Sequence, residues 1–255
     1  VQIVGNKLAN SIVGGSKADT LNGGAGNDTL TGGKGKDVFI YTAGKDVITD
    51  YAASDKISVG GAISKASVSG SDVVFTVGKG SLTVNNAKDK SLAITDSKGN
   101  SYSATVGNAM AITLTNSTAS PVTLDAAIKS VDASKRTKAV QITGNKLANS
   151  IVGGKSNDTL AGGKGSDSLW GGKGSDTFIY DAGDGKDIIY GFGNNDLLQI
   201  TGGNVTASYS KSKNSVAFKV GKTSNAITLR DFGSTTLFHV NDTTYQLSGG
   251  KLTAR

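Results

Sequence analysis

Two stretches of the chain, 14–40 and 153–179, repeat themselves every nine residues. Each nonapeptide opens with two glycines, carries an aspartate at its sixth position and places one large apolar residue at its eighth. A variant with asparagine in place of the aspartate precedes each array, at 5–13 and 144–152, and another variant follows the first array at 41–49. A fixed period of this kind indicates a repeat architecture in which each unit packs on its neighbours.

The composition of one nonapeptide predicts its local structure. Six residues that are rich in glycine and end in aspartate suit a turn, because glycine adopts positive φ angles without strain. The other three, with a large apolar residue in the middle, suit a very short strand. Such strands are not stable alone, so we expect them to stack into a solenoid with one narrow core. The residues expected to form that core are Ile12, Leu21, Leu30, Phe39, Ile151, Leu160, Leu169 and Phe178.

The chain of 255 residues contains a duplication. Residues 1–41 align without gaps to 140–180, and 30 of the 41 positions are identical. After this point the second copy gains Asp184 and Gly185, and the two copies then diverge. We expect two structural units, 1–117 and 118–255, each with a tightly constrained front half and a looser rear half.

The rear halves, 57–115 and 197–253, alternate apolar and polar residues between glycine or Asn-Asp turns, which predicts antiparallel strands. We expect them to form a small sheet that covers the open end of each solenoid, since an uncapped solenoid exposes a strand edge. The segment 116–140 contains the only proline. It is either a linker or, through Val122, Leu124, Ile128 and Val131, the N-terminal cap of the second array.

The repeated aspartates point to a bound cation. All 20 acidic residues of the chain are aspartates, and stacking the nonapeptides would align them in columns about 4.8 Å apart, where like charges repel. A cation between the carboxylates removes that repulsion. Carboxylates together with the carbonyls of glycine-rich loops form an oxygen-only ligand set, which suits Ca²⁺ better than Zn²⁺ or Cu²⁺.

The nonapeptides resemble the RTX (repeats-in-toxin) haemolysin-type calcium-binding family, whose pattern G-G-x-G-x-D-x-U-x, with U a large apolar residue, is matched in full at 23–31, 32–40, 162–170 and 171–179. The resemblance extends over roughly 1–60 and 140–200. It implies an all-β fold with two parallel β-roll arrays, each with two nonapeptides per turn. Lys17 and Ser156 stand where the pattern has its third glycine, which predicts a weaker first site in each array.

The resemblance also implies which residues bind calcium, with about two to three ions in each unit. Loops two nonapeptides apart would share one ion, which pairs Asn10 with Asp28, Asp19 with Asp37, and Asp28 with Asp46 in the first roll. The corresponding pairs in the second roll are Asn149 with Asp167, Asp158 with Asp176, and Asp167 with Asp187. Loop carbonyls would complete the ligand shells, and they belong to Gly14, Gly15, Gly23, Gly24, Gly26, Gly32, Gly33, Gly35, Gly153, Gly154, Gly162, Gly163, Gly165, Gly171, Gly172 and Gly174. Asp50, Asp55 and Asp196 lie outside the repeats, and a capping role and an ion-binding role both stay open for them.

The sequence offers no set of catalytic residues, and we expect a protein that is not an enzyme. His239 is the only histidine, and the chain contains neither a G-x-S-x-G motif nor any glutamate, which argues against histidine-based triads, α/β-hydrolase chemistry and a glycosidase site. Trp170 follows the inward Leu169 and is expected to point outward. An outward tryptophan can contact a ligand, but local packing is the simpler interpretation, and its counterpart in the first unit is Thr31.

These patterns predict a calcium-binding module of a secreted bacterial protein that acts as a spacer or surface-interaction region. As the resemblance implies, it would leave the cell through the type I secretion machinery and fold outside on meeting Ca²⁺. Alternatives are an accessory targeting module of a secreted epimerase, lipase or protease, and an adhesin segment that binds surface glycans. The formal net charge of +7, which four bound Ca²⁺ ions would raise to about +15, allows an anionic surface polymer as partner, although a solvated surface is the simpler interpretation. Lysines without interleaved aromatic residues argue against nucleic acid, and no apolar run reaches the length of a membrane span.

Overall fold

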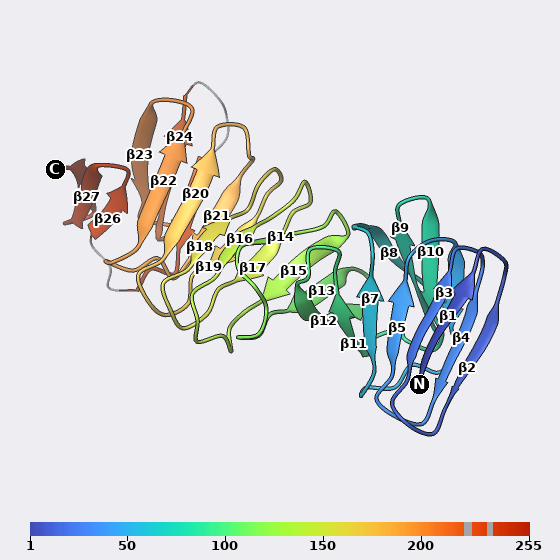
Figure 1. The fold of residues 1–255 in the computed structure, drawn as a ribbon. Helices are drawn as coiled ribbons and strands as arrows, with labels where there is room; N and C mark the ends of the chain where they lie inside the picture. Colours follow the sequence, from blue (N-terminus) through green and yellow to red (C-terminus); the bar gives the residue numbers. More distant parts are fainter. Residues whose placement is uncertain (222–225, 234–236) are drawn as a thin grey trace. The chain divides into compact units, whose positions relative to one another are not determined.

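The computed structural model describes residues 1–221, 226–233 and 237–255, and these residues form strands, turns and loops without any helix. The chain divides into two compact units (Figure 1). Unit 1 comprises Val1–Ala119 and Asp125–Ile128, and unit 2 comprises Ser120–Leu124 and Lys129–Arg255.

The front half of unit 1 is a parallel solenoid of two sheets, as predicted. Odd and even strands alternate between the sheets, so each strand pairs with the strand two further along the chain. The register Ile3↔Leu21↔Phe39↔Ile57 gives one coil every 18 residues, or two nonapeptides per turn. The first sheet contains β1 (Gln2–Asn6), β3 (Thr20–Gly24), β5 (Val38–Tyr41) and β7 (Lys56–Val59), and the second contains β2 (Ser11–Gly15), β4 (Thr29–Gly33) and β6 (Lys45–Ile48).

The rear half of unit 1 is antiparallel but is not a separate covering sheet. It continues both sheets of the roll, because β10 pairs in parallel with β6 and β11 pairs in parallel with β7. Each of these two strands belongs to an antiparallel meander, so the last roll strand of each sheet keeps a hydrogen-bonded neighbour instead of an open edge. The strands are β8 (Ile63–Ser69), β9 (Asp72–Val77) and β10 (Gly80–Val84) in one sheet, and β11 (Ser91–Thr95), β12 (Ser101–Val106) and β13 (Met110–Thr113) in the other.

Unit 2 repeats this plan. Its parallel strands in one sheet are β14 (Val122–Thr123), β16 (Gln141–Thr143), β18 (Thr159–Ala161), β20 (Thr177–Asp181) and β22 (Leu197–Thr201). Those in the other are β15 (Ile128–Asp132), β17 (Ser150–Val152), β19 (Ser168–Trp170) and β21 (Asp187–Tyr190). The antiparallel extensions are β26 (Leu237–Val240), β27 (Thr243–Ser248) and β28 (Lys251–Ala254) on the first sheet, and β25 (Ala226–Arg230), β24 (Ser215–Val220) and β23 (Val205–Ser210) on the second.

The segment between the two repeat arrays contributes strands to the second roll. The strand β14 pairs in parallel with β16, and β15 pairs in parallel with β17. The apolar residues Val122, Leu124, Ile128 and Val131 are all buried. The segment therefore forms a strand-bearing part of the fold and not an extended linker.

The cores of both rolls are columns of single apolar residues. All eight residues predicted from the nonapeptide pattern are buried, from Ile12 at 7% exposed to Leu21 and Leu160 at 0%. Their neighbours along each strand point outward, as the period of two in a strand requires. This column of inward side chains fixes the register, and the register in turn places the aspartates of successive coils one above another.

Candidate metal centres

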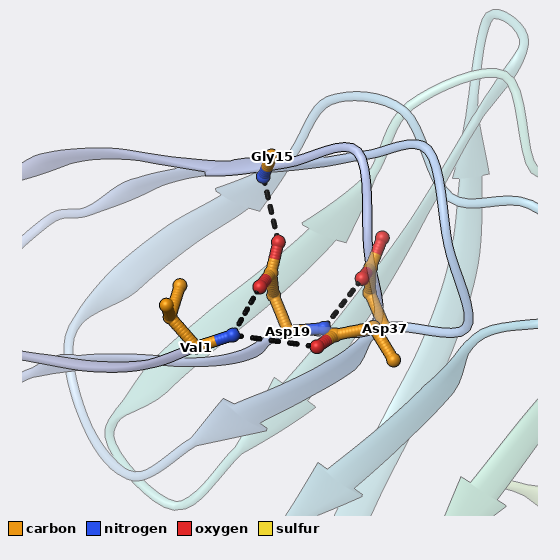
Figure 2. Close-up of polar contacts among 5 residues, drawn as sticks. Val1, Gly15, Asp19 and Asp37 are labelled. Atoms are coloured by element: carbon orange, nitrogen blue, oxygen red, sulfur yellow. Dashed lines mark hydrogen bonds and ion pairs between the residues drawn. The ribbon is translucent and has the colours of Figure 1, made fainter.

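Each unit contains two ladders of aspartates, one along each edge where the chain turns from one sheet to the other. Within a ladder, a carboxylate Oδ1 accepts a hydrogen bond from the backbone N–H of the residue one coil earlier. In Figure 2 the N–H of Asp19 donates to Asp37 Oδ1 over 2.9 Å, and the terminal amine of Val1 lies 2.5 Å from Asp19 Oδ1. Each ladder therefore links coil to coil through side chains as well as through strand pairing.

The pairs predicted from the sequence are all brought together in these ladders. In unit 1 the N···Oδ1 distances are 2.8 Å for Asn10 to Asp28, 2.9 Å for Asp19 to Asp37 and 3.1 Å for Asp28 to Asp46. In unit 2 they are 2.6 Å for Asn149 to Asp167, 2.8 Å for Asp158 to Asp176 and 3.0 Å for Asp167 to Asp187. Every aspartate of these pairs is buried, with at most 4% of its surface exposed.

Two residues outside the nonapeptides end one ladder in each unit, namely the ladder that contains Asp19 and the ladder that contains Asp158. The N–H of Asp37 donates to Asp55 Oδ1 over 3.0 Å, and the N–H of Asp176 donates to Asp196 Oδ1 over 2.9 Å. Both carboxylates also accept from their own loops, at the N–H of Ala52 and of Gly193. Asp55 and Asp196 are therefore the last members of the ladders.

Asp50 has a different place. Its two carboxylate oxygens accept hydrogen bonds from the N–H groups of Gly32 and Gly33, each over 2.8 Å. It caps one glycine-rich turn and lies outside the ladders. The sequence left a capping role and an ion-binding role open for Asp50. The hydrogen bonds in the structure are those of the capping role.

The first glycine of each nonapeptide makes room for the aspartate five residues later. A Cβ on Gly23 would lie 2.2 Å from Asp28 Oδ2, and one on Gly32 would lie 2.5 Å from Asp37 Oδ2, distances that side chains do not adopt. A Cβ on Gly14 would meet both Asp19 Oδ2, at 2.6 Å, and the Gly32 carbonyl oxygen, at 2.4 Å. A side-chain oxygen and a carbonyl oxygen of the next coil thus approach the same point.

The same convergence occurs in the second unit. A Cβ on Gly153 would lie 2.8 Å from Asp158 Oδ2 and 2.3 Å from the Gly171 carbonyl oxygen. Gly144 stands in the leading variant of that array. A Cβ on Gly144 would lie 2.6 Å from Asn149 Oδ1 and 1.9 Å from the Gly162 carbonyl oxygen. A Cβ on Gly5 would likewise lie 2.2 Å from the Gly23 carbonyl oxygen and 2.3 Å from Asn10 Oδ1. The carbonyl oxygens of Gly23, Gly32, Gly162 and Gly171 therefore lie beside ladder side chains.

Other predicted carbonyl ligands already take part in hydrogen bonds between coils. The Gly15 carbonyl accepts from the N–H of Lys34, and the Gly154 carbonyl accepts from that of Lys173. Hydroxyl groups of Thr42 and Ser54 donate to the carbonyls of Gly24 and Gly35. Six further glycines of the predicted set stand second or fourth in a full repeat and adopt positive φ angles, which glycine does without strain. They are Gly26, Gly33, Gly163, Gly165, Gly172 and Gly174. All of the predicted glycines stay predicted ligands.

Four ladder carboxylates have one oxygen that is buried and lacks a hydrogen-bond partner among the residues that the structure describes. These atoms are the Oδ2 atoms of Asp28, Asp37, Asp46 and Asp167. A buried acceptor without a partner is costly, and an ionised one more so, unless a cation satisfies it. By contrast, Asp19 Oδ2 accepts from the N–H of Gly15 over 2.6 Å.

Asp158 behaves like Asp19, because its Oδ2 accepts from the N–H of Gly154 over 2.5 Å. These two aspartates belong to the repeats in which Lys17 and Ser156 replace the third glycine. In both, the loop supplies a partner to the oxygen that stays without one in Asp28 and Asp167. The weaker first site of each array stays a prediction.

The electrostatics of the ladders disfavour ionised carboxylates in the absence of a cation. Burial, opposed only in part by backbone hydrogen bonds, raises the pKa of Asp46, Asp167 and Asp176 to about 6. Burial raises the pKa of Asp187 to about 7, and the nearby charges of Asp167 and Asp184 contribute to this increase. The ladders therefore favour a bound positive charge, either a proton or a metal ion.

The arrangement fits a hard divalent cation. Among the described residues no three His, Cys, Asp or Glu side chains form a cluster, so any ion site along these loops combines a small number of carboxylates with backbone carbonyls. Oxygen ligands of this type suit Ca²⁺, which accepts six to eight of them in variable geometry. The unpartnered Oδ2 atoms would be its carboxylate ligands. Bound there, the ion would neutralise the ladder and connect successive coils.

The comparison with protein families agrees with this interpretation. The family described as RTX calcium-binding nonapeptide repeat (4 copies) matches residues 4–39, 143–178 and 179–206. Among solved structures, the extracellular lipase LipA from Serratia marcescens is 19% identical, with a TM-score of 0.28; the alignment covers 91% of this chain and 38% of the lipase chain. The comparison with curated protein sequences finds no match.

Proposed function

Since this chain carries RTX haemolysin-type calcium-binding nonapeptide repeats in several copies, we propose that it is a module that folds on binding Ca²⁺ outside the cell. The observation that carries this proposal is the set of buried, unpartnered Oδ2 atoms in the aspartate ladders. The roll cannot bury these atoms as free carboxylates without a large electrostatic cost. Binding free energy of the ion therefore becomes folding free energy.

Calcium dependence would keep the module unfolded inside the cell and let it fold outside. In the low-calcium cytosol the aspartates of successive coils would repel one another, so the chain would stay unfolded and suitable for export by a type I secretion system. At millimolar Ca²⁺ the ions would neutralise the ladders and the apolar columns would pack. The repeats support secretion of the protein, and we propose that it follows the type I route. No helix in the described part of the chain has the length and hydropathy of a membrane span.

We propose a structural role for the folded module, without catalytic activity of its own. It would stiffen and space a longer extracellular chain and present sheet faces to other molecules. This proposal is supported by the use of the aspartates in ladders and by the burial of the apolar columns. His239, the single histidine, lies in strand β26, where its Nδ1 is 3.1 Å from Thr244 Oγ1.

Circular dichroism tests the calcium proposal. Exhaustive chelation with EDTA should abolish the β-sheet signal, and added Ca²⁺ should restore it. Mg²⁺ should restore it poorly, because Mg²⁺ requires a tighter octahedral shell than flexible loops provide. A chelated sample that keeps its spectrum and melting temperature would contradict the proposal.

A further inference from the structure

An aromatic pair distinguishes the outer face of the second roll from that of the first. Trp170 on β19 and Tyr190 on β21 stack with ring centroids 4.6 Å apart and planes within 6° of parallel. They are direct neighbours across two strands, in a row that runs Val152↔Trp170↔Tyr190↔Arg230. In Figure 1 these strands lie in the central part of unit 2.

The roll does not need this pair. At the equivalent places of unit 1 stand Thr31 on strand β4 and Thr49 directly after strand β6, and their hydroxyl groups are 2.7 Å apart. The backbone register is the same, since Leu30 pairs with Ile48 as Leu169 pairs with Ile189. One scaffold thus supports both a short hydroxyl pair and a stacked aromatic pair, so the aromatic pair is an addition specific to unit 2.

Beside the two aromatic substitutions, Trp170 for Thr31 and Tyr190 for Thr49, lies a third difference between the units. In unit 1, Asp50 follows Thr49 and places its two carboxylate oxygens on the N–H groups of Gly32 and Gly33. In unit 2, Gly191 follows Tyr190, so no side chain occupies that place, and a Cβ there would meet nothing within 4 Å. The equivalent N–H groups belong to Gly171 and Gly172. Within the described residues of unit 2, no side chain accepts from either of them.

These three differences meet in one groove. It has a volume of about 390 Å³ and is lined by Ser150, Val152, Trp170, Gly172, Tyr190 and Gly191. One part of the groove is aromatic, and the other contains the exposed backbone of Gly172 and Gly191, next to the buried Gly171. Ser150 adds a hydroxyl group at its edge. Ligand sites typically combine an apolar wall with a small number of polar groups in this way.

The charge beside the groove favours an anion. Arg230 is exposed at the end of the aromatic row and forms no ion pair with any described residue. Lys173 directly follows Gly172, and successive backbone N–H groups in a glycine turn form an anion-binding concavity. The one acid of the row, Asp132, lies beyond Val152 at the opposite end.

We propose that this groove binds an acidic sugar, whose carboxylate takes the place that Asp50 occupies in the first unit. The carboxylate would accept from the N–H groups of Gly171 and Gly172. The apolar C–H face of the sugar ring would pack on the aromatic pair, and its hydroxyl groups would reach Ser150. The aromatic wall favours a sugar over a simple carboxylate because only a ring with an apolar face uses it.

Trp170 makes the test direct, because it is the only tryptophan and its fluorescence reports on this groove alone. We would titrate the full chain, in saturating Ca²⁺, with trimers of galacturonate, mannuronate and glucuronate and with sialyllactose. The matched ligands are the carboxyl-reduced trimers and lactose, which keep the rings but lack the charge. At least one acidic sugar should give a saturable change, with at least tenfold weaker binding of its neutral counterpart.

Two substitutions at one position supply the protein control. Gly191→Asp would place a carboxylate of the chain itself near the glycine N–H groups and should abolish binding, whereas Gly191→Asn has the same size without the charge and should keep it. Both residues tolerate the positive φ of 68° at this position better than other side chains do. Tyr190→Thr, the residue found in unit 1, should weaken binding at least tenfold by calorimetry.

The proposal rests on the calcium-folded roll proposed above, so every titration is made on protein whose circular dichroism shows the calcium-dependent β signal. With that signal present, three results would overturn the acidic-sugar site and leave the calcium function standing. They are no saturable response to any acidic sugar, equal binding of the reduced sugars, and equal binding by Gly191→Asp and Gly191→Asn. Preferential binding of a short peptide through its C-terminal carboxylate would overturn it as well.

Discussion

Each ladder aspartate uses its two oxygens for different tasks. Oδ1 holds the coils together by accepting a backbone N–H, whereas Oδ2 has no partner in Asp28, Asp37, Asp46 and Asp167. The first task needs only an acceptor, and the second needs a charge. Asparagine at Asn149 shows that the amide side chain can occupy a ladder position, where its Oδ1 accepts from the N–H of Asn145.

This division predicts the effect of removing the charge alone. Asp28→Asn and Asp167→Asn keep an oxygen that accepts the N–H of Asn10 or Asn149, but they lose the carboxylate next to the ion. Charge-assisted contacts contribute about 1.5–3 kcal/mol, so we expect the affinity for Ca²⁺ to fall by roughly ten- to a hundredfold in isothermal titration. Asp242→Asn, in the exposed turn after β26, is the matched control and should leave the affinity unchanged. Equal losses in all three variants would refute the ligand assignment.

The raised pKa values of the ladder predict how pH affects the calcium-free protein. A carboxyl whose folded pKa lies above its unfolded value stabilises the fold when protonated, and this contribution disappears as pH rises through the folded pKa. For Asp46, Asp167, Asp176 and Asp187, with pKa values of about 6 to 7, the contribution is lost between about pH 4 and pH 7.

Calcium-free protein should therefore show more β-sheet circular-dichroism signal at pH 5 than at pH 7.5, where we expect it to be unfolded. Protons and calcium compete for the same oxygens, so the affinity for Ca²⁺ should rise over the same pH range. Circular dichroism of calcium-free protein and calcium titrations at the two pH values check both statements. A calcium-free β-sheet signal that rises with pH would contradict the burial argument.

At the scale of the nonapeptide, each glycine position has its own structural reason. The first glycine gives space to the aspartate five residues later, and the second and fourth positions adopt positive φ angles in the full repeats, as at Gly24 and Gly26. Gly15 differs, because its φ is not positive and a Cβ there would lie 3.7 Å from the nearest atom, Asp19 Oδ2. Glycines of the same pattern therefore differ in how well they tolerate substitution.

We expect Gly23→Ala to damage the site and Gly15→Ala to be tolerated. The new Cβ at position 23 would lie 2.2 Å from Asp28 Oδ2 and 2.6 Å from Asp28 Cβ, so the whole side chain would have to move. Overpacking of this kind costs about 1–3 kcal/mol, and the displaced carboxylate should also bind calcium less tightly. Thermal melts at fixed Ca²⁺ measure the first effect and calorimetry the second. Similar behaviour of the two variants would contradict the steric reading.

The sequence predicted most of the roll and of the ladders, because both depend on residues that recur at a fixed period. The apolar residue of each nonapeptide determines the roll, and the aspartate determines the ladder. It predicted less about the ladder ends. Asp55 and Asp196 do not belong to a nonapeptide, yet each lies one coil after a ladder aspartate, 18 residues from Asp37 and 20 from Asp176 across the inserted Asp184 and Gly185. The coil spacing is the signal that would have found them.

The antiparallel extensions were predicted as strands but not in their correct place. Alternating residues in 57–115 predict strands but do not say which edge each strand joins. The pairing of β10 with β6 and of β11 with β7 depends on contacts between distant parts of the chain. The buried residues Val84 and Ile94, which pair with Ile48 and Ile57, extend the apolar columns of the roll into these strands, and local sequence does not encode that register.

At the scale of the whole molecule, the duplication provides each unit with a complete set of parts. Each has two ladders, a buried apolar column and two antiparallel extensions. The chain between the arrays contributes to both units. Ser120–Leu124 belongs to unit 2, and Asp125–Ile128 belongs to unit 1. Within unit 1, Asp125 Oδ2 accepts the N–H of Ile63 over 3.0 Å, and Asp125 Oδ1 lies 3.5 Å from Lys98 Nζ.

The last prediction is that each unit folds without the other. A fragment of residues 118–255 contains every ladder residue of unit 2, so it should give a soluble domain that binds about half as much Ca²⁺ as the whole chain. A fragment of residues 1–128 should fold in the same way, whereas 1–117 should be less stable because it lacks Asp125, the buried acceptor for Ile63. Circular dichroism and calcium titration of the three fragments measure these differences. If 118–255 stays unfolded at millimolar Ca²⁺ while the full chain folds, the units depend on each other, and the role as a string of independent spacers fails.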